Sequence, residues 1–146
     1  MKLKIMVDSS SGITQEEAIK LGIDVFPLRI IFDDKEYLDG IDIMQDEFYE
    51  KLTKEEIFPK TSLPNLYEIE KKVKAYVQDG YSVIILPLSK EISGTYSALV
   101  SMMEDYENVR VIDTLTTICG LRFLVNEAIQ LKVDTLDELE IKLRDL

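Results

Sequence analysis

The chain has 146 residues, 46% of them hydrophobic, and its 28 acidic and 17 basic residues give a formal net charge of −11. We expect one acidic globular domain, which at this size buries roughly 70% of the surface that the unfolded chain exposes. The acidic excess argues against a nucleic-acid partner, because phosphate recognition depends on clustered Lys and Arg. The absence of histidine excludes His-based catalysis, Ser-His-Asp triads and the common His/Cys zinc sites within this chain.

The single cysteine and the first residues bear on the compartment. Cys119 has no partner for an intrachain disulfide, so nothing indicates an oxidising compartment, and a buried thiol is the expected role. Lys4 and Asp8 interrupt the first apolar run, which is too short and too charged for a signal peptide or a membrane span. We therefore expect a cytoplasmic protein without a membrane span.

The first predicted elements are a strand and a short helix. Residues 2–7 are β-branched and aliphatic and are followed by a turn-forming cluster at 8–12. Thr14 and Glu17 fit a capping box, in which each side chain bonds the other's backbone amide, and Gly22 ends the helix that the box begins.

A second strand and a hairpin are expected next. Residues 24–32 are again β-rich, and Pro27 within them favours an edge position or a bulge, because proline cannot donate to a strand partner. Residues 33–35 form a turn into a hairpin arm at 36–38, and residues 44–53 have helical spacing.

Helices and strands alternate through the rest of the chain. A helix with Leu66, Ile69 and Val73 on one face is predicted to begin near residues 61–64 and to end at Gly80. Further elements are expected at 83–86 (strand), 96–103 (helix), 109–112 (strand), 118–131 (helix) and from a capping box at Thr135 and Glu138 to the end (helix). This alternation predicts an α/β fold with a mostly parallel sheet flanked by helices.

Ligands of such folds lie beyond the carboxyl ends of the strands. Three loops at 8–12, 89–95 and 113–117 meet this condition, and the loop at Thr61–Ser62, expected at a helix start, is a fourth. A P-loop sequence and a GxGxxG sequence are both absent, which disfavours nucleotide binding by those routes.

Two of these loops carry hydroxyl groups where a helix is predicted to begin. The segment Ser93–Thr95 offers backbone amides, a glycine that permits close approach and two hydroxyls, which suits a carboxylate or a phosphate. Taken alone, a serine there more often only caps the helix. Thr61 and Ser62 before Pro64 pose the same choice, because a first-turn proline marks an ordinary helix entrance.

Asp8 and Asp113 each follow a predicted buried strand and are candidates for a nucleophilic or metal-binding carboxylate. Such aspartates more commonly organise the turn or cap the next helix. The loop after Asp8 has no further acidic residue to help hold a metal ion, so a carboxylate-dependent hydrolase or phosphatase ranks last among the hypotheses, and no metal site is predicted.

Several motifs occur together in an order that is more specific than any one of them. The motifs are Val7-Asp8-Ser9, Val25-Phe26-Pro27-Leu28, Tyr37-Leu38-Asp39-Gly40, Glu47-Phe48-Tyr49 with Leu52, Pro59-Lys60-Thr61-Ser62-Leu63-Pro64, Leu88-Ser89, Ser93-Gly94-Thr95-Tyr96 with Ala98, Val111-Ile112-Asp113, and Leu124-Val125 with Glu127-Ala128. In this order and at this spacing they resemble the amino-terminal part of the DegV family, over essentially all 146 residues.

The resemblance implies a fatty-acid-binding protein that presents the acyl carboxylate to a separate kinase and is not itself an enzyme. It implies no cofactor and no catalytic residue, with a long-chain fatty acid as the ligand. The residues that it assigns to the head group are Thr61, Ser62, Ser93, Gly94 and Thr95, and the candidate walls for the acyl chain are Phe26, Pro27 and Leu28.

The chain departs from the family at two positions and in length. Asn65 stands where the family has serine, and Arg122 replaces an expected small residue. Family members are about twice as long, and their second domain covers the acyl chain and contributes basic groups to the head-group site. Residues 1–146 are therefore expected to be a single domain equivalent to the amino-terminal half, which could assemble with itself or with a separate carboxyl-terminal half. The alternative hypothesis is a scaffold domain that retains no lipid, for which the apolar segment 118–131 would be the interface.

Overall fold

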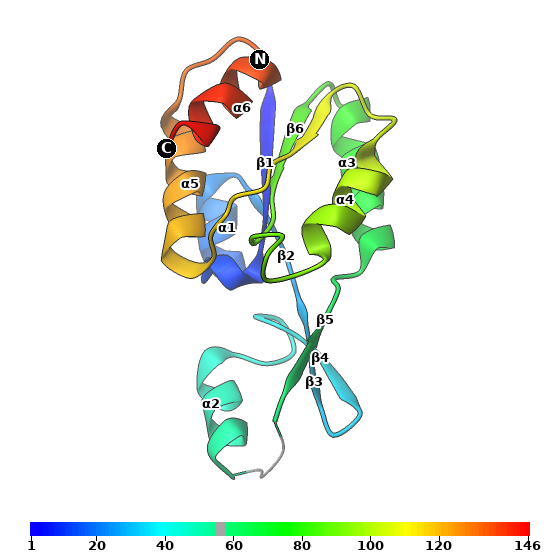
Figure 1. The fold of residues 1–146 in the computed structure, drawn as a ribbon, viewed down its shortest axis with the longest axis vertical. Helices are drawn as coiled ribbons and strands as arrows, with labels where there is room; N and C mark the ends of the chain where they lie inside the picture. Colours follow the sequence, from blue (N-terminus) through cyan, green and yellow to red (C-terminus); the bar gives the residue numbers. More distant parts are fainter. Residues whose placement is uncertain (55–57) are drawn as a thin grey trace.

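The computed structural model describes residues 1–54 and 58–146 and contains two β-sheets. The larger sheet has four parallel strands in the order β2-β1-β6-β7, with bounds Asp24–Phe26, Leu3–Asp8, Ser82–Leu86 and Val109–Val111. Helices α1, α5 and α6 (Gln15–Leu21, Ile118–Gln130 and Leu136–Arg144) cover one face, and α3 and α4 (Leu66–Gln78 and Thr95–Met103) cover the other (Figure 1). The predicted α/β fold with a mostly parallel sheet is confirmed.

The central strands β1 and β6 have apolar side chains on both faces because both faces are covered. Ile5 and Val7 of β1 pack with helices α1, α5 and α6, whereas Met6 between them packs with α3 and α4. Ile84 and Ile85 of β6 divide between the same two clusters. This explains why the sequence shows continuous apolar runs here rather than an alternating pattern.

The smaller sheet is antiparallel and lies below the larger one in Figure 1. Its strands are in the order β4-β3-β5, with bounds Lys35–Leu38, Arg29–Phe32 and Lys60–Ser62, and helix α2, Gln45–Lys54, packs beside it. Asp33 and Asp34 both have positive φ, as a two-residue hairpin turn requires, so the predicted hairpin is confirmed. Ile30, Phe32 and Ile43 form its core.

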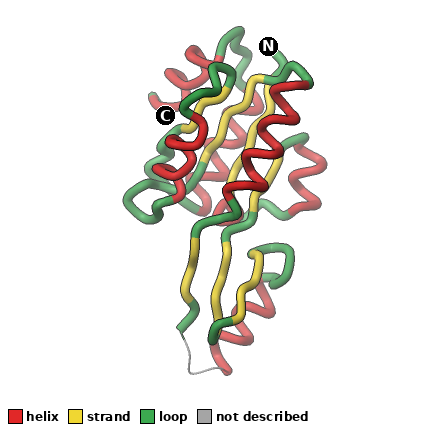
Figure 2. The backbone as a smooth tube through the Cα atoms, turned by 90° about the vertical axis from the view of Figure 1, so that its right-hand side faces the viewer, coloured by secondary structure: helices red, strands yellow, loops and turns green. Residues whose placement is uncertain are grey.

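The prediction of one strand over residues 24–32 is wrong, because the chain leaves one sheet at Pro27 and joins the other at Arg29. Pro27 has no N–H to donate and Leu28 donates its N–H to Ser9 Oγ (3.0 Å), so neither N–H continues the parallel pairing of β2 with β1. The expected edge position holds for β2, which lies at the border of the parallel sheet. Figure 2 shows this connection beside the returning one between β5 and α3.

The predicted helix start at Thr61–Ser62 is also wrong. Both residues belong to β5, where Thr61 pairs with Ile30 and Ser62 with Arg29. Helix α3 begins at Leu66, after Asn65, whose side-chain oxygen accepts the N–H of Glu68. Asn65 is therefore the N-cap of α3, whereas the sequence led us to expect the helix start at Thr61 and Ser62.

The two predicted capping boxes have different outcomes. In α1, Thr14 and Glu17 each bond the other's backbone N–H, so that box is confirmed. In α6, Thr135 accepts the N–H of Glu138, but the Glu138 carboxylate accepts the N–H of Asp134 instead of that of Thr135. The second box is thus replaced by a related arrangement shifted by one residue.

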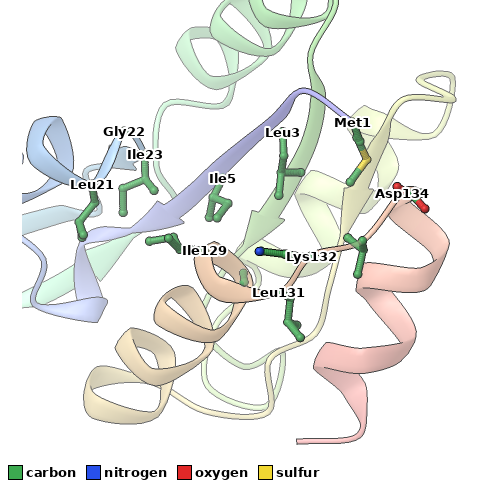
Figure 3. A pocket seen from close by; sticks show the side chains of 12 residues that line it. Met1, Leu3, Ile5, Leu21, Gly22, Ile23, Ile129, Leu131, Lys132 and Asp134 are labelled. Carbon is green, nitrogen blue, oxygen red and sulfur yellow. The ribbon is translucent and has the colours of Figure 1, made fainter.

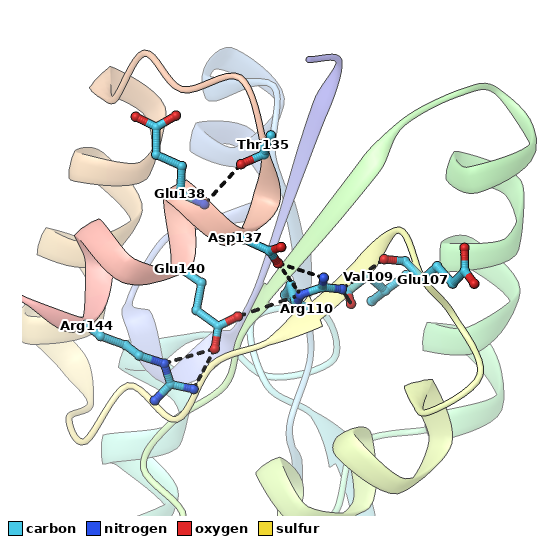
Figure 4. A network of polar contacts seen from close by, with 8 residues as sticks. All are labelled: Glu107, Val109, Arg110, Thr135, Asp137, Glu138, Glu140 and Arg144. Atoms are coloured by element: carbon cyan, nitrogen blue, oxygen red, sulfur yellow. Dashed lines mark hydrogen bonds and ion pairs between the residues drawn. The ribbon is translucent and has the colours of Figure 1, made fainter.

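Arg110 fastens α6 to the border strand β7 (Figure 4). Its guanidinium lies 2.8 Å from Asp137 and 3.7 Å from Glu140, both on α6. It also donates to the carbonyl of Val109 at 3.0 Å, on its own strand. One side chain thereby links the border of the sheet to the last helix.

Cys119 is exposed, so the expectation of a buried thiol is wrong. It lies in the first turn of α5, whose buried residues are Leu121, Leu124, Val125 and Ala128. The position of Cys119 two residues before Leu121 turns it away from that buried stripe. Among the helices in residues 1–54 and 58–146, none is long and apolar enough to cross a membrane.

Candidate functional site at the carboxyl edge of the sheet

The loops that follow β1, β6 and β7 are bonded to one another, as expected for neighbouring parallel strands. Ser89 after β6 donates its N–H to the carbonyl of Thr116 after β7 (2.9 Å). Thr117 donates its hydroxyl to Ser10 Oγ after β1 (3.0 Å). The three loops therefore form one continuous surface, rich in hydroxyl groups.

Asp8, at the end of β1, is completely buried. Its two carboxylate oxygens accept the N–H of Ser10 at 2.8 Å and the N–H of Leu88. Burial raises the pKa of the Asp8 carboxyl above its ordinary value, against the effect of these hydrogen bonds, and the nearby Asp39 also raises it. This aspartate organises the loops and is not open to a substrate.

Asp113, at the corresponding end of β7, has a similar role. Its Oδ1 accepts the N–H of Lys90 (3.2 Å) and of Leu115 (3.3 Å), and Lys90 Nζ lies 3.4 Å from Oδ2. Within residues 1–54 and 58–146, no group of three or more His, Cys, Asp or Glu side chains could hold a metal ion. Both aspartates therefore match the structural alternative considered for them.

Ser93, Gly94 and Thr95 lie together at the start of α4, as predicted. Gly94 is the N-cap and has no side chain to bond the first turn. Ser93 Oγ accepts the N–H of Thr95 (3.2 Å) and lies 2.9 Å from Thr95 Oγ1. Thr95 is fully buried, so of these three residues only Ser93 and Gly94 have exposed surface.

Leu63, which follows Thr61 and Ser62 in the chain, lies next to the start of α4. A Cβ built on Gly94 would lie 3.7 Å from Leu63 Cδ2, so the Leu63 side chain lies beside Gly94, which remains exposed. Directly paired residues of a sheet share a face, so Thr61 points to the side of Ile30 and Ser62 to the opposite side. The hydroxyls of Thr61 and Ser62 therefore lie on opposite faces of the smaller sheet.

A groove of 650 Å³ opens between the loop after β1 and the smaller sheet. Its size lies within the usual range for small-molecule sites. Ile30, which shares its sheet face with Thr61, lines it. Its apolar lining residues are Ile13, Val25, Ile30, Met44, Phe48 and Tyr49, and Ser9, Ser10 and Thr14 add hydroxyls.

The predicted wall residues lie elsewhere. Phe26 is buried in the core beneath α3 and α4, and together with Pro27 it borders a different hollow of 390 Å³. Leu28 is half-buried and its amide bonds Ser9. The residues that do line the groove were missed because they come from segments far apart in the sequence, although the apolar spacing of α2 was a usable signal.

A third cavity, of 570 Å³, lies beside the beginning of β1 (Figure 3). Leu3 and Ile5 of β1, Leu21 at the end of α1 and Ile129 of α5 border it. These residues belong to the opposite ends of their strands and helices from the hydroxyl-bearing loops. This cavity is therefore separate from the candidate site.

Arg122, one of the two positions at which the sequence departs from the family pattern, is hydrogen-bonded to the loop after β1 and to α1. It donates to Glu17 Oε2 at 2.8 Å and to the carbonyl of Gly12 at 2.8 Å. It thus joins α5 to the N-terminal turn of α1, beside the groove.

Comparison with known proteins gives the family. The DegV family profile matches residues 2–141. DegV domain-containing proteins of Clostridium perfringens and Listeria monocytogenes are 34% and 31% identical, over 95% and 99% of this chain and 51% and 53% of their own lengths. The chain thus spans about half the length of these relatives.

Solved structures show the same fold. A stearic-acid-binding protein of Eubacterium ventriosum superposes with a TM-score of 0.87 at 28% identity, covering 100% of this chain and 53% of that protein. A DegV lipid-binding protein of Thermotoga maritima gives 0.85 at 29% identity, covering 99% and 54%. By its sequence and its fold, this chain belongs to the DegV family.

Proposed function

We propose that this chain supplies the amino-terminal half of a fatty-acid-binding site and binds the ligand without chemical conversion. The observation that carries the proposal is the contact of Leu63 with Gly94, which brings the strand bearing Thr61 to the open start of α4. A helix N-terminus with a glycine cap offers N–H donors and a partial positive charge to a carboxylate. Structures of relatives described as fatty-acid-binding support the choice of ligand.

Thr61 and Ser93 are the proposed hydroxyl contacts of the head group, with Gly94 contributing through the backbone. Thr95 is fully buried and supports Ser93 by donating its N–H to Ser93 Oγ. Ser62 faces the other side of its sheet and is a weaker candidate. The 650 Å³ groove, rather than Phe26, Pro27 and Leu28, is the surface proposed for the acyl chain. In this scheme the acyl carboxylate stays at the exposed loop edge, where a partner kinase would reach it and a second domain would supply basic groups.

The scaffold alternative has lost its main motivation. It relied on the apolar segment 118–131 as an exposed interface, but the stripe formed by Leu121, Leu124, Val125 and Ala128 is buried against the parallel sheet. Ile118 and Phe123 remain exposed, as scattered apolar side chains commonly do.

The test is direct binding of oleate or palmitate to the purified chain, together with solvent extraction and mass spectrometry of lipid retained from the expression host. We expect bound fatty acid, and at least tenfold weaker binding after Thr61→Val or Ser93→Ala. Ser101→Ala, which removes an exposed hydroxyl further along α4, is the matched control and should bind like the parent. Absence of both retained lipid and binding of added lipid contradicts the proposal.

A further inference from the structure

Asp8 combines two properties that rarely occur together: it is a carboxylate with no exposed surface, and no lysine or arginine pairs with it in the described part of the chain. A buried ionised group without a cationic partner is costly unless hydrogen bonds compensate. Its partners are the backbone N–H groups of Ser10 and Leu88, one on each carboxylate oxygen. The carboxylate thus supplies the hydrogen-bond acceptors that water would otherwise provide to two backbone amides, which belong to different loops.

The loop that Asp8 holds through Leu88 is the loop that ends at Ser93. Ser89 follows Leu88 directly, and its carbonyl accepts the N–H of Ser93 at 3.2 Å. Ser89 Oγ also accepts the N–H of Glu91, which folds the loop into a compact turn. The position of Ser93 is therefore linked to that of Leu88 by one peptide bond, from Leu88 to Ser89, and one hydrogen bond, from Ser93 to Ser89.

The next two residues after Asp8 reach two further segments. Ser9 Oγ accepts the N–H of Leu28, on the connection to the smaller sheet, at 3.0 Å. Ser10 Oγ accepts the hydroxyl of Thr117, on the loop after β7, at 3.0 Å. Three consecutive residues thus bond three segments that surround the candidate site, and of these three bonds the one made by Asp8 reaches the loop of Ser93 directly.

An aspartate suits this position better than an amide of the same shape. Its contacts are all donors, namely the backbone N–H groups of Ser10 and Leu88 and the Ser10 hydroxyl, so both oxygens must accept. Asparagine would turn its NH2 group toward one of these donors and leave that buried amide without an acceptor. The presence of aspartate therefore indicates that this side chain fixes the distance between the loop after β1 and the loop after β6.

We propose that Asp8 is a positioning residue for fatty-acid binding: its carboxylate fixes the loop that ends at Ser93 relative to the loop after β1, and so sets the head-group contacts. The inference rests on the proposed function. Asp8 does not touch the ligand in this scheme, because it has no exposed surface. Its effect on binding passes through Leu88 and Ser89 to Ser93 and Gly94.

The experiment compares Asp8→Asn with Asp24→Asn in the full chain. Asp24 is a matched control because it is also buried in the parallel sheet but bonds Lys72 and Tyr76, at the opposite end of the neighbouring strand. Binding of oleate is measured under conditions where both variants are folded, and amide proton and nitrogen shifts are recorded by NMR for the free proteins.

We expect Asp8→Asn to weaken oleate binding at least tenfold and to shift the amide signals of Leu88, Ser93 and Gly94, whereas Asp24→Asn should leave both readouts near those of the parent. A merely structural role of Asp8 would lower stability without changing affinity in the folded protein, and that result overturns the proposal. If the parent does not bind oleate, the proposed function fails, and the NMR comparison decides the positioning role: unchanged signals at Ser93 and Gly94 in Asp8→Asn then overturn it.

Discussion

The side chain of Leu63 lies beside Gly94, so that a Cβ at position 94 would stand 3.7 Å from Leu63 Cδ2. This is an ordinary van der Waals distance and not a clash. Gly94 has φ −73° and ψ −1°, which any residue can adopt. Neither the space at position 94 nor its backbone conformation therefore requires glycine, and a steric need for it would come from a ligand that approaches the backbone from outside.

Gly94→Ala tests that need. We expect a loss of about 1 kcal/mol in the free energy of unfolding, because alanine is a much poorer N-cap residue than glycine. Fatty-acid binding should weaken at least tenfold, since the added methyl group would stand where the head group reaches the helix start. Urea unfolding and an oleate titration measure the two effects, with Ser97→Ala, exposed in the same helix, as the control. Equal affinity of Gly94→Ala and the parent would contradict this role.

The parallel sheet could be predicted from the sequence because its central strands are buried on both faces and appear as short apolar runs bounded by turn residues. The division of residues 24–32 between two sheets could not, since Val25 and Ile30 are both β-branched apolar residues. Pro27 allowed either an edge strand or a bulge, and the tertiary bond from Leu28 to Ser9 is not visible in the sequence. Thr61 was misplaced because a Ser/Thr–Pro pattern favours a helix start, whereas here pairing with Ile30 decides its conformation.

The candidate site, too, was predictable from the sequence only in part. Ser93, Gly94 and Thr95 were predictable because the helix start that presents them is local in sequence. The groove was not, because its walls combine the loop after β1 with Ile30 and Phe48 from the smaller sheet and its helix. Arrangement of distant segments depends on packing, which periodicity does not encode.

Ser9→Ala should loosen the connection between the two sheets. The substitution leaves the partly buried N–H of Leu28 without its 3.0 Å acceptor, for which we expect a loss of about 1 kcal/mol in the free energy of unfolding. Urea unfolding measures this loss, and hydrogen exchange at Leu28 should accelerate at the same time. Ser97→Ala again serves as the control. Unchanged exchange at Leu28 would show that the hydroxyl does not hold the connection.

The exposure of Cys119 predicts that its thiol reacts in the native protein. Ellman's reagent should modify it without denaturant and at a rate close to that of the urea-unfolded chain, because the side chain is open to solvent at the start of α5. Cys119→Ser should abolish the signal, since the chain has no other cysteine. A thiol that reacts only after unfolding would contradict the exposed position.

Arg122 and Glu17 join α5 to α1 through a charge-assisted contact of 2.8 Å. Hydrogen bonding to Arg122 is the main reason that the pKa of Glu17 lies below its ordinary value of 4.5. A carboxyl group whose pKa is lower in the folded state stabilises the fold above the unfolded-state pKa, and this contribution disappears as the pH falls through the folded-state value. Both side chains are 40% exposed, so salt should screen the contact.

Arg122→Gln should therefore be less stable than the parent at neutral pH, and the difference between the two should shrink as the pH falls below 4.5, the ordinary value for Glu17. Urea unfolding as a function of pH measures this difference, and added salt should reduce it at neutral pH. Lys20→Gln, which breaks the more exposed contact with Glu16, is the control and should show a smaller difference at every pH. A difference for Arg122→Gln that stays constant down to the acid transition would mean that the bond to the carbonyl of Gly12, and not the ion pair with Glu17, makes the contribution.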